Sequence, residues 1–177
     1  DALEASGTIT TVVLDKTGTL TTGEMTVRSI ATVPGVAEHE LLRVAASVEQ
    51  GSEHLIARAI VAAAKQQIAD LDPVRDFIAV PGRGASGTVA GDTVHIGSLA
   101  YLDEQGVSTG AARVYLTEAD ATESTVFVSQ AGRLIGRFGL ADTIKPNARA
   151  AIQALQQQGL TTVLLTGASR TAAKEIA

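Results

Sequence analysis

The segment ITTVVLDKTGT, residues 9–19, determines how the rest of the chain is interpreted. Its first six residues are β-branched or apolar, which predicts a buried strand, and one of parallel type because both faces are apolar. The strand ends at Asp15, and a carboxylate at the carboxyl end of a parallel strand can meet a ligand and attack a phosphoryl group. The Thr- and Gly-rich loop that follows can direct N–H groups and hydroxyls at phosphate oxygens. An ordinary strand exit with an Asp turn is the alternative.

Outside this segment, helical and extended patterns alternate, then become mainly extended, then alternate again. Apolar residues at helical spacing predict a helix over 38–48 and a second helix capped by Ser52. Pro146 is expected at the first position of a helix over 148–158 that stops at Gly159. Further strands are expected at 25–33, 76–80, 86–89, 93–96, 125–129, 134–139 and 161–165. This order predicts an α/β unit that is interrupted by an antiparallel α+β insertion.

The composition limits the classes of function. The 177 residues are 45% hydrophobic and 3% aromatic, with a net charge of −5 and no cysteine. Basic residues form no tract, which argues against a nucleic-acid partner, and the lack of cysteine excludes disulfides and thiolate metal sites. There is no signal peptide, and no apolar run reaches the roughly 18 to 20 residues of a membrane helix, so the chain itself is expected to be soluble.

At residues 15–19 the chain resembles the P-type ATPases, whose phosphorylation loop reads DKTGT and which belong to the haloacid dehalogenase-like superfamily. The resemblance implies that Asp15 accepts the γ-phosphate of ATP, that Lys16 and Thr17 share this catalytic site, and that Asp15 and Thr17 hold Mg²⁺. In the phosphatases of the superfamily, the second residue after the nucleophile is usually an Asp that acts as general acid and base. Thr17 cannot handle a proton in that way, so the acyl phosphate is expected to persist, which favours a pump over a soluble phosphatase.

Residues 51–54, GSEH, resemble the Ser-Glu-His-Pro motif of the heavy-metal class of these pumps. The resemblance implies that His54 contacts ATP and that Glu49 reads the edge of the adenine. Leu55 stands where the family has Pro. The alternative for His54 is a solvated side chain in the first turn of an amphipathic helix.

Residues 82–87, GRGASG, form a Gly-x-Gly-x-x-Gly string between short strands. It is not a dinucleotide-binding fingerprint, because no helix with a downstream acidic residue follows, and alone it would be a hairpin connection. In heavy-metal pumps a Gly-x-Gly at this place lets the backbone approach the nucleotide. The resemblance assigns that role to Gly82 and Gly84, and a further nucleotide-site glycine to Gly97, which is followed by Ser98 in place of the family's Asn.

Two later motifs belong to the same resemblance. Residues 142–146, DTIKP, match the family's return into the phosphorylation domain and are equally compatible with a helix start. Thr166 and Gly167 match its Thr-Gly-Asp motif, in which a Thr hydroxyl at a strand end holds the transferring phosphoryl group, whereas Ala168 replaces the carboxylate. Residues 101–120 follow no clear pattern. His39 and His95 lie in no motif and are interpreted as surface residues.

The resemblance covers nearly the whole chain and implies an incomplete, Rossmannoid phosphorylation domain, residues 1–26 and 138–177, with an inserted antiparallel nucleotide-binding domain, residues 27–137. It implies part of a cation-exporting pump at the cytoplasmic face of a membrane, with ATP and Mg²⁺ as cofactors, the pump's transmembrane and actuator domains as partners, and copper as the leading ion. The family's Gly-Asp-Gly-x-Asn-Asp segment is not among these residues, so the isolated chain is expected to be inactive. The alternatives are a haloacid dehalogenase-like phosphatase and a non-catalytic nucleotide-binding module.

Overall fold

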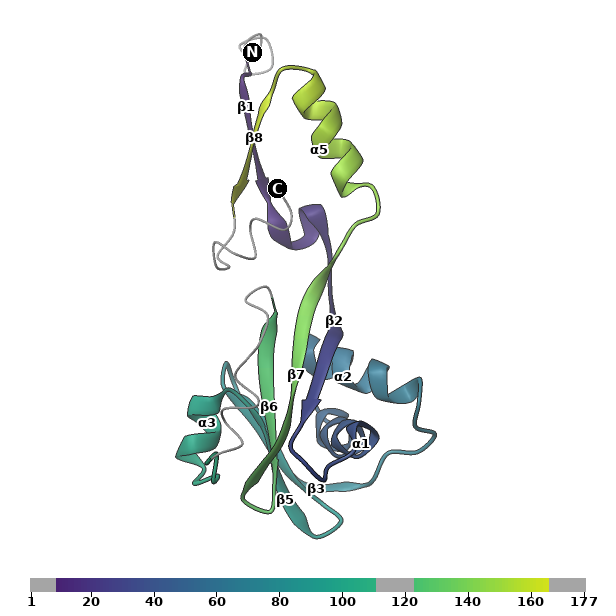
Figure 1. Cartoon of the computed structure of the whole chain (residues 1–177), viewed down its shortest axis with the longest axis vertical. Helices are drawn as coiled ribbons and strands as arrows, with labels where there is room; N and C mark the ends of the chain where they lie inside the picture. Colours follow the sequence, from purple (N-terminus) through teal and green to yellow (C-terminus); the bar gives the residue numbers. More distant parts are fainter. Residues whose placement is uncertain (1–8, 111–122, 166–177) are drawn as a thin grey trace. The chain divides into compact units, whose positions relative to one another are not determined.

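The computed structural model describes residues 9–110 and 123–165. The chain divides into two compact units, one formed by residues 1–24 and 142–177 and the other by residues 25–141 (Figure 1). Two long strands, β2 (Thr21–Thr32) and β7 (Arg133–Ile144), carry the chain out of the first unit and back into it. In the part of the chain that the structure describes, no helix has the length and apolar character needed to cross a membrane.

The first unit contains a parallel pair of strands, β1 (Thr11–Asp15) and β8 (Thr161–Leu165), in register from Thr11 opposite Thr161 to Asp15 opposite Leu165. The predicted parallel type of β1 is confirmed, but its predicted burial on both faces is wrong. Val12 and Leu14 are half-buried, whereas the Val13 side chain is 59% exposed. Among the described residues, β8 is the one strand that pairs with β1, and the helix of this unit, α5 (Ala148–Gln157), packs on β8. One face of β1 therefore stays exposed.

The start of α5 differs from its prediction. Asn147 is the N-cap, so Pro146 lies before the cap and not at the first helical position. The predicted stop is confirmed: Gly159 adopts a φ of +80°, and its N–H donates to the Gln156 carbonyl at 3.0 Å. A left-handed glycine directly after the cap residue is the usual way in which a helix ends.

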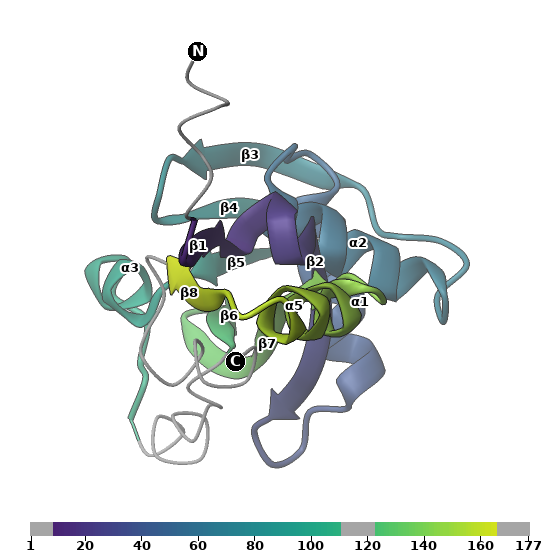
Figure 2. The same ribbon diagram turned by 90° about the horizontal axis from the view of Figure 1, so that it is seen from above.

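The second unit is built on a six-stranded sheet in the order β2-β7-β6-β5-β4-β3, and the paired strands from β7 to β3 are antiparallel as predicted. Helices α1 and α2 cover one face of the sheet and α3 lies on the other, as Figures 1 and 2 show from two directions. The bounds of these elements are β3 Val74–Val80, β4 Gly84–Val89, β5 Asp92–Gly97, β6 Ser124–Gln130, α1 Glu38–Glu49, α2 Leu55–Lys65 and α3 Leu99–Glu104.

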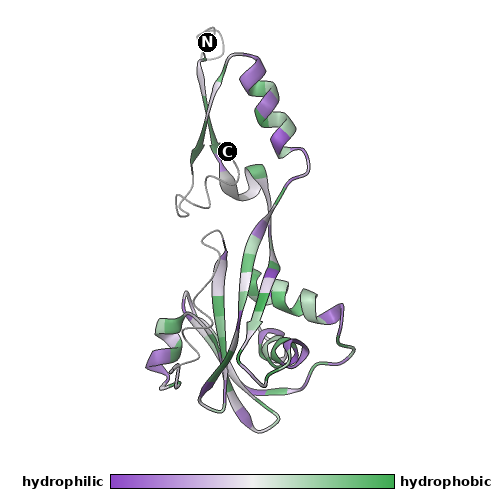
Figure 3. Cartoon of the chain, viewed as in Figure 1, coloured by the Kyte–Doolittle hydropathy of each residue, from purple (hydrophilic) through white to green (hydrophobic). Residues whose placement is uncertain are grey.

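The main core lies between the two helices and the sheet. Alternate residues of β5 and β6 point to opposite faces, so Val94 and Val128 join α1, whereas Phe127 packs with α3. Leu41 and Leu42 of α1 are fully buried, which stabilises the unit by about 2 kcal/mol each. Figure 3 shows hydrophobic residues along β6 and β7 and a mixed pattern along α5. The core therefore consists mainly of aliphatic side chains and contains few aromatic ones.

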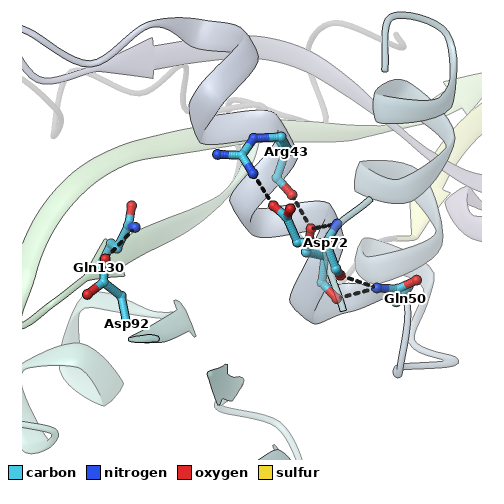
Figure 4. A network of polar contacts seen from close by, with 6 residues as sticks. Arg43, Gln50, Asp72, Asp92 and Gln130 are labelled. Carbon is cyan, nitrogen blue, oxygen red and sulfur yellow. Dashed lines mark hydrogen bonds and ion pairs between the residues drawn. The ribbon is translucent and has the colours of Figure 1, made fainter. Parts of the chain in front are cut away.

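A polar network fixes the end of α1 to the loop before β3 (Figure 4). The Arg43 guanidinium pairs with the Asp72 carboxylate, and the Asp72 N–H donates to Ser47 Oγ at 3.0 Å. Gln50 Nε2 donates to the Asp72 carbonyl at 3.0 Å. These contacts join α1 and its C-cap Gln50 to the loop, next in sequence to Glu49, the last residue of α1.

Candidate functional site

A cavity of about 290 Å³ lies in the second unit, where the end of α1, the start of α2, the β3–β4 turn and the end of β5 meet. It brings together all five residues that the sequence motifs assigned to a nucleotide, although they come from four separate segments. These residues are Glu49, His54, Gly82, Gly84 and Gly97. The cavity has apolar walls with a few convergent polar groups, which is the usual composition of a small-molecule site. Its apolar surface comes from Ile56, Val80, Ile96 and Val126, among others.

Glu49 lines this cavity and is almost completely buried. Only 6% of the residue is exposed, and burial raises the pKa of its carboxyl to about 7, because the charged form loses its water. Near neutral pH the group therefore exists in both forms. A neutral carboxyl presents one O–H donor and one acceptor oxygen side by side, a pattern that complements a ring edge with one acceptor and one donor.

The raised pKa of Glu49 makes stability depend on pH. The folded chain holds this proton up to about pH 7, whereas an unfolded carboxyl releases it near pH 4.5, so stability is lost as the pH rises between these values. We expect the Glu49→Gln variant to gain about 2 kcal/mol relative to the wild type between pH 5 and pH 8. Chemical denaturation at a series of pH values measures this difference. A constant difference would show that Glu49 titrates normally.

His54 is the N-cap of α2, a position that the sequence assigned to Ser52. Its Nδ1 accepts the N–H of Ile56 at 3.3 Å, and Ser52 Oγ accepts the N–H of His54 at 3.3 Å. Because Nδ1 is an acceptor, the neutral ring carries its proton on Nε2, the nitrogen that remains available to a ligand. Leu55 takes the first helical position, where the resemblance expects Pro and where the N–H makes no intrahelical bond. In this chain the hydrogen bond from the Ile56 N–H to Nδ1 orients the His54 ring.

Gly84 and Gly97 lie directly opposite each other on β4 and β5. A Cβ on Gly84 would lie 2.2 Å from the Ile96 carbonyl oxygen and 2.7 Å from the Tyr101 ring, and a Cβ on Gly97 would lie 2.4 Å from the Arg83 carbonyl oxygen. Both positions therefore require glycine for packing, whatever ligand the cavity holds. Gly82 is different, since a Cβ there would meet nothing within 4 Å, and the requirement is its φ of +71° in the turn.

Tyr101 does not line the cavity but packs against two of its glycines, a contact that the sequence did not reveal. It belongs to α3, within the stretch for which no pattern was found, and its ring is buried against the two glycines. Ser98, the N-cap of α3, accepts the N–H of Tyr101 at 3.2 Å, and this cap is the one signal that could have located the helix.

His95 packs against the same ring, so its interpretation as a surface residue is wrong. Its ring lies edge-on to Tyr101 with centroids 6.1 Å apart, and its buried Nδ1 has no hydrogen-bond partner in the part of the chain that the structure describes. Burial accordingly lowers the pKa of His95. His39 is exposed, as predicted.

In the first unit, Asp15 is the exposed last residue of β1, and a single π-helical turn, Lys16–Leu20, follows it directly. Lys145 fixes this turn at two points: its Nζ donates to the Gly18 carbonyl at 2.6 Å, and its N–H donates to the Leu20 carbonyl at 2.9 Å. Lys16 and Thr17 thus lie in an anchored backbone turn next to Asp15.

Asp142 anchors the end of the same loop. Its carboxylate accepts the Thr21 hydroxyl at 2.6 Å and the Gly23 N–H at 3.1 Å, and Thr21 Oγ1 in turn accepts the Gly18 N–H at 3.2 Å. The motif of residues 142–146 therefore closes on the loop that follows Asp15. Thr166, Gly167 and Ala168 lie outside the described residues.

Comparison with known families gives one match that spans most of the chain. The family model for haloacid dehalogenase-like hydrolases matches residues 9–177. The chain belongs to this family.

Curated relatives of this haloacid dehalogenase-like chain are membrane pumps. It is 40% identical over 176 residues to a copper-exporting P-type ATPase of Mycobacterium tuberculosis, and the match covers 99% of this chain and 23% of the relative. It is 42% identical over 177 residues to the cation-transporting P-type ATPase B of Mycobacterium leprae, again with 99% and 23% covered. The chain thus spans about a quarter of the length of these relatives.

Solved structures agree with the curated relatives. A zinc-transporting PIB-type ATPase in the E2·Pi state superimposes with a TM-score of 0.82 at 35% identity, over 99% of this chain and 28% of that one. The catalytic domain of the CPx-ATPase CopB-B superimposes with a TM-score of 0.73 at 27% identity, over 99% and 61%. The predicted fold class and the resemblance to heavy-metal P-type ATPases are confirmed.

The described residues of the first unit include Asp15, the carboxylate that the resemblance assigned to Mg²⁺. No group of three or more His, Asp or Glu side chains that could hold a metal occurs in residues 9–110 or 123–165. Mg²⁺ commonly binds through one or two carboxylates together with substrate phosphates, and keeps several waters. The exposed carboxylate of Asp15 fits such a role for an ion that arrives with a nucleotide.

Proposed function

We propose that the chain is the nucleotide-binding and phosphorylation part of an ATP-driven heavy-metal pump. The observation that carries this proposal is the convergence of five motif residues from four segments on one cavity of the second unit. The names of the relatives, which include copper-exporting and cation-transporting ATPases, support the pump class and favour copper as the ion. In this proposal the chain works at the cytoplasmic face of a membrane, with transmembrane and actuator domains as partners.

The cavity suits the base and sugar of ATP. The buried Glu49 can pair with the edge of the adenine, and apolar side chains such as Ile56 and Ile96 can contact its faces. His54, with its donor on Nε2, can hydrogen-bond a ligand oxygen. Gly82 keeps the turn open on one side, because a side chain is absent there.

Asp15 is the proposed phosphate acceptor. A carboxylate oxygen would attack the γ-phosphorus, the bond from that phosphorus to the β–γ bridging oxygen would break, and ADP would leave with the electron pair. Mg²⁺, when bound, supplies charge neutralisation for the phosphoryl group. The anchors from Lys145 and Asp142 hold the loop after Asp15 in one conformation. Thr17, in place of a second Asp, leaves the acyl phosphate without a general base for water.

Titration of the chain with ATP, followed by amide NMR, tests the binding site. We expect a Kd of about 0.1 to 1 mM and shifts at the amides of Glu49, His54, Gly82 and Gly84. The His54→Ala variant should bind about five times more weakly, because one hydrogen bond of about 1 kcal/mol is lost. Its melting temperature should fall by no more than about 3 °C, because the exposed side chain contributes only the cap bond to α2, worth about 1 kcal/mol.

His39→Ala is the matched control, since this exposed histidine does not line the cavity. It should leave ATP binding unchanged. A His54→Ala variant that binds ATP as well as the wild type, or that loses much of its stability, would assign His54 a purely structural role.

A further inference from the structure

Arg83 is the one Lys or Arg among the described residues that line the 290 Å³ cavity. The other ionisable side chains on its wall are Glu49 and His54, neither of which carries a fixed positive charge. The chain as a whole has a net charge of −5, so its overall field does not attract an anion. Among the described residues of the cavity wall, Arg83 is therefore the one that can supply a full positive charge to a phosphate chain.

The backbone of Arg83 is held in place. Its N–H donates to the Val80 carbonyl at 3.0 Å, and its carbonyl accepts the Ser98 N–H at 3.2 Å. The side chain, in contrast, is 45% exposed. Since Glu49 is buried and the Arg83 side chain is exposed, a nucleotide whose base pairs with Glu49 can direct its phosphates toward solvent and toward Arg83.

The Arg83 guanidinium is paired with Glu104, the last residue of α3. Glu104 does not line the cavity, and its side chain is 54% exposed. Hydrogen bonding and charge from this carboxylate raise the pKa of Arg83. An exposed ion pair of this kind contributes little to stability, because solvent screens it, whereas a guanidinium binds phosphate oxygens through two parallel hydrogen bonds. The pair is therefore weak enough to be exchanged for a polyphosphate.

We propose that the Arg83 guanidinium binds the phosphate chain of the nucleotide and that the Glu104 carboxylate competes with that chain for it, an inference that rests on the proposed ATP-binding function. Glu104 thereby sets how strongly the cavity distinguishes ATP from adenosine. Without a ligand, the ion pair holds the guanidinium on Glu104. With a ligand, the guanidinium exchanges one anion for another of higher charge.

The test compares two variants that remove the same ion pair from opposite sides. The 177-residue chain, its Arg83→Gln variant and its Glu104→Gln variant are titrated with ATP and with adenosine, in EDTA so that only side chains neutralise the phosphates. Arg83→Gln should weaken ATP binding about fivefold and Glu104→Gln should strengthen it about twofold, while adenosine binding stays the same for both. If the pair were only a brace between α3 and the turn, both variants would change ATP binding in the same direction.

Arg75→Gln is the matched control, because it removes an equal charge from an exposed position on β3 that does not line the cavity. It should leave both affinities unchanged, and an effect equal to that of Arg83→Gln would attribute the result to net charge and overturn the proposal. Equal weakening of ATP and adenosine by Arg83→Gln would overturn it as well. If the wild type bound neither ligand, the proposed function itself would fail, which is a different outcome from ATP binding that ignores Arg83.

Discussion

Replacement of Asp15 by Asn should abolish the phosphoenzyme of a full-length pump that carries this sequence. An amide is nearly the same size as a carboxylate but is not a nucleophile toward phosphorus, so chemistry is lost while the fold is kept. The fold is spared because Asp15 is exposed at the end of β1, where the carboxylate is not part of a core. The measurement is incubation with γ-labelled ATP and Mg²⁺, followed by detection of acid-stable, hydroxylamine-sensitive label on the protein.

The outcomes of this experiment separate the candidate functions. Label that remains in Asp15→Asn would place the acceptor elsewhere. Rapid ATP hydrolysis without accumulated label would favour the phosphatase alternative, in which water attack is fast despite Thr17. A pump that never labels would favour a nucleotide-binding module without turnover.

Local signals made much of the fold predictable from the sequence. The helix over 38–48 and the strand over 161–165 carry strong periodicity or a continuous apolar run, and both elements form within a residue of the predicted bounds. The cavity residues were predicted by motif resemblance, which contains no geometry, and the structure then places all of them on one surface. The motif at 142–146 was matched in the same way, and its contacts with the loop after Asp15 come only from the structure.

Features that depend on distant partners were not predictable. The carboxylate of Asp142 binds a hydroxyl 121 residues away, and nothing in either local sequence indicates the contact. The exposure of Val13 depends on how many strands and helices surround β1, and not on the residue itself. Tyr101 of α3 is buried against two glycines that lie on strands β4 and β5. The cap of α2 was misassigned because Ser52 and His54 can both accept a backbone N–H, and only the backbone path decides between them.

The Gly84→Ala variant should lose about 4 kcal/mol of stability, and ATP binding with it. The new methyl group would lie 2.2 Å from the Ile96 carbonyl oxygen, a backbone atom of the paired strand that cannot rotate away. This places the cost above the usual range for an overpacked side chain. Relief could come only from separation of β4 and β5, which also form the wall of the cavity. The melting temperature should therefore fall by about 10 °C or more.

Gly82→Ala, two residues away, is the matched comparison for this last prediction. Its methyl group would meet nothing within 4 Å, so the cost is confined to the φ of +71° and amounts to about 1 kcal/mol. Trimming the ring with Tyr101→Ala should not rescue Gly84→Ala, because the nearest atom belongs to Ile96 and not to Tyr101. Thermal melts and ATP titrations of the three single variants and the double variant measure these differences. If Gly84→Ala were no less stable than Gly82→Ala, or if Tyr101→Ala restored it, the close approach of β4 and β5 would not be what requires glycine at this position.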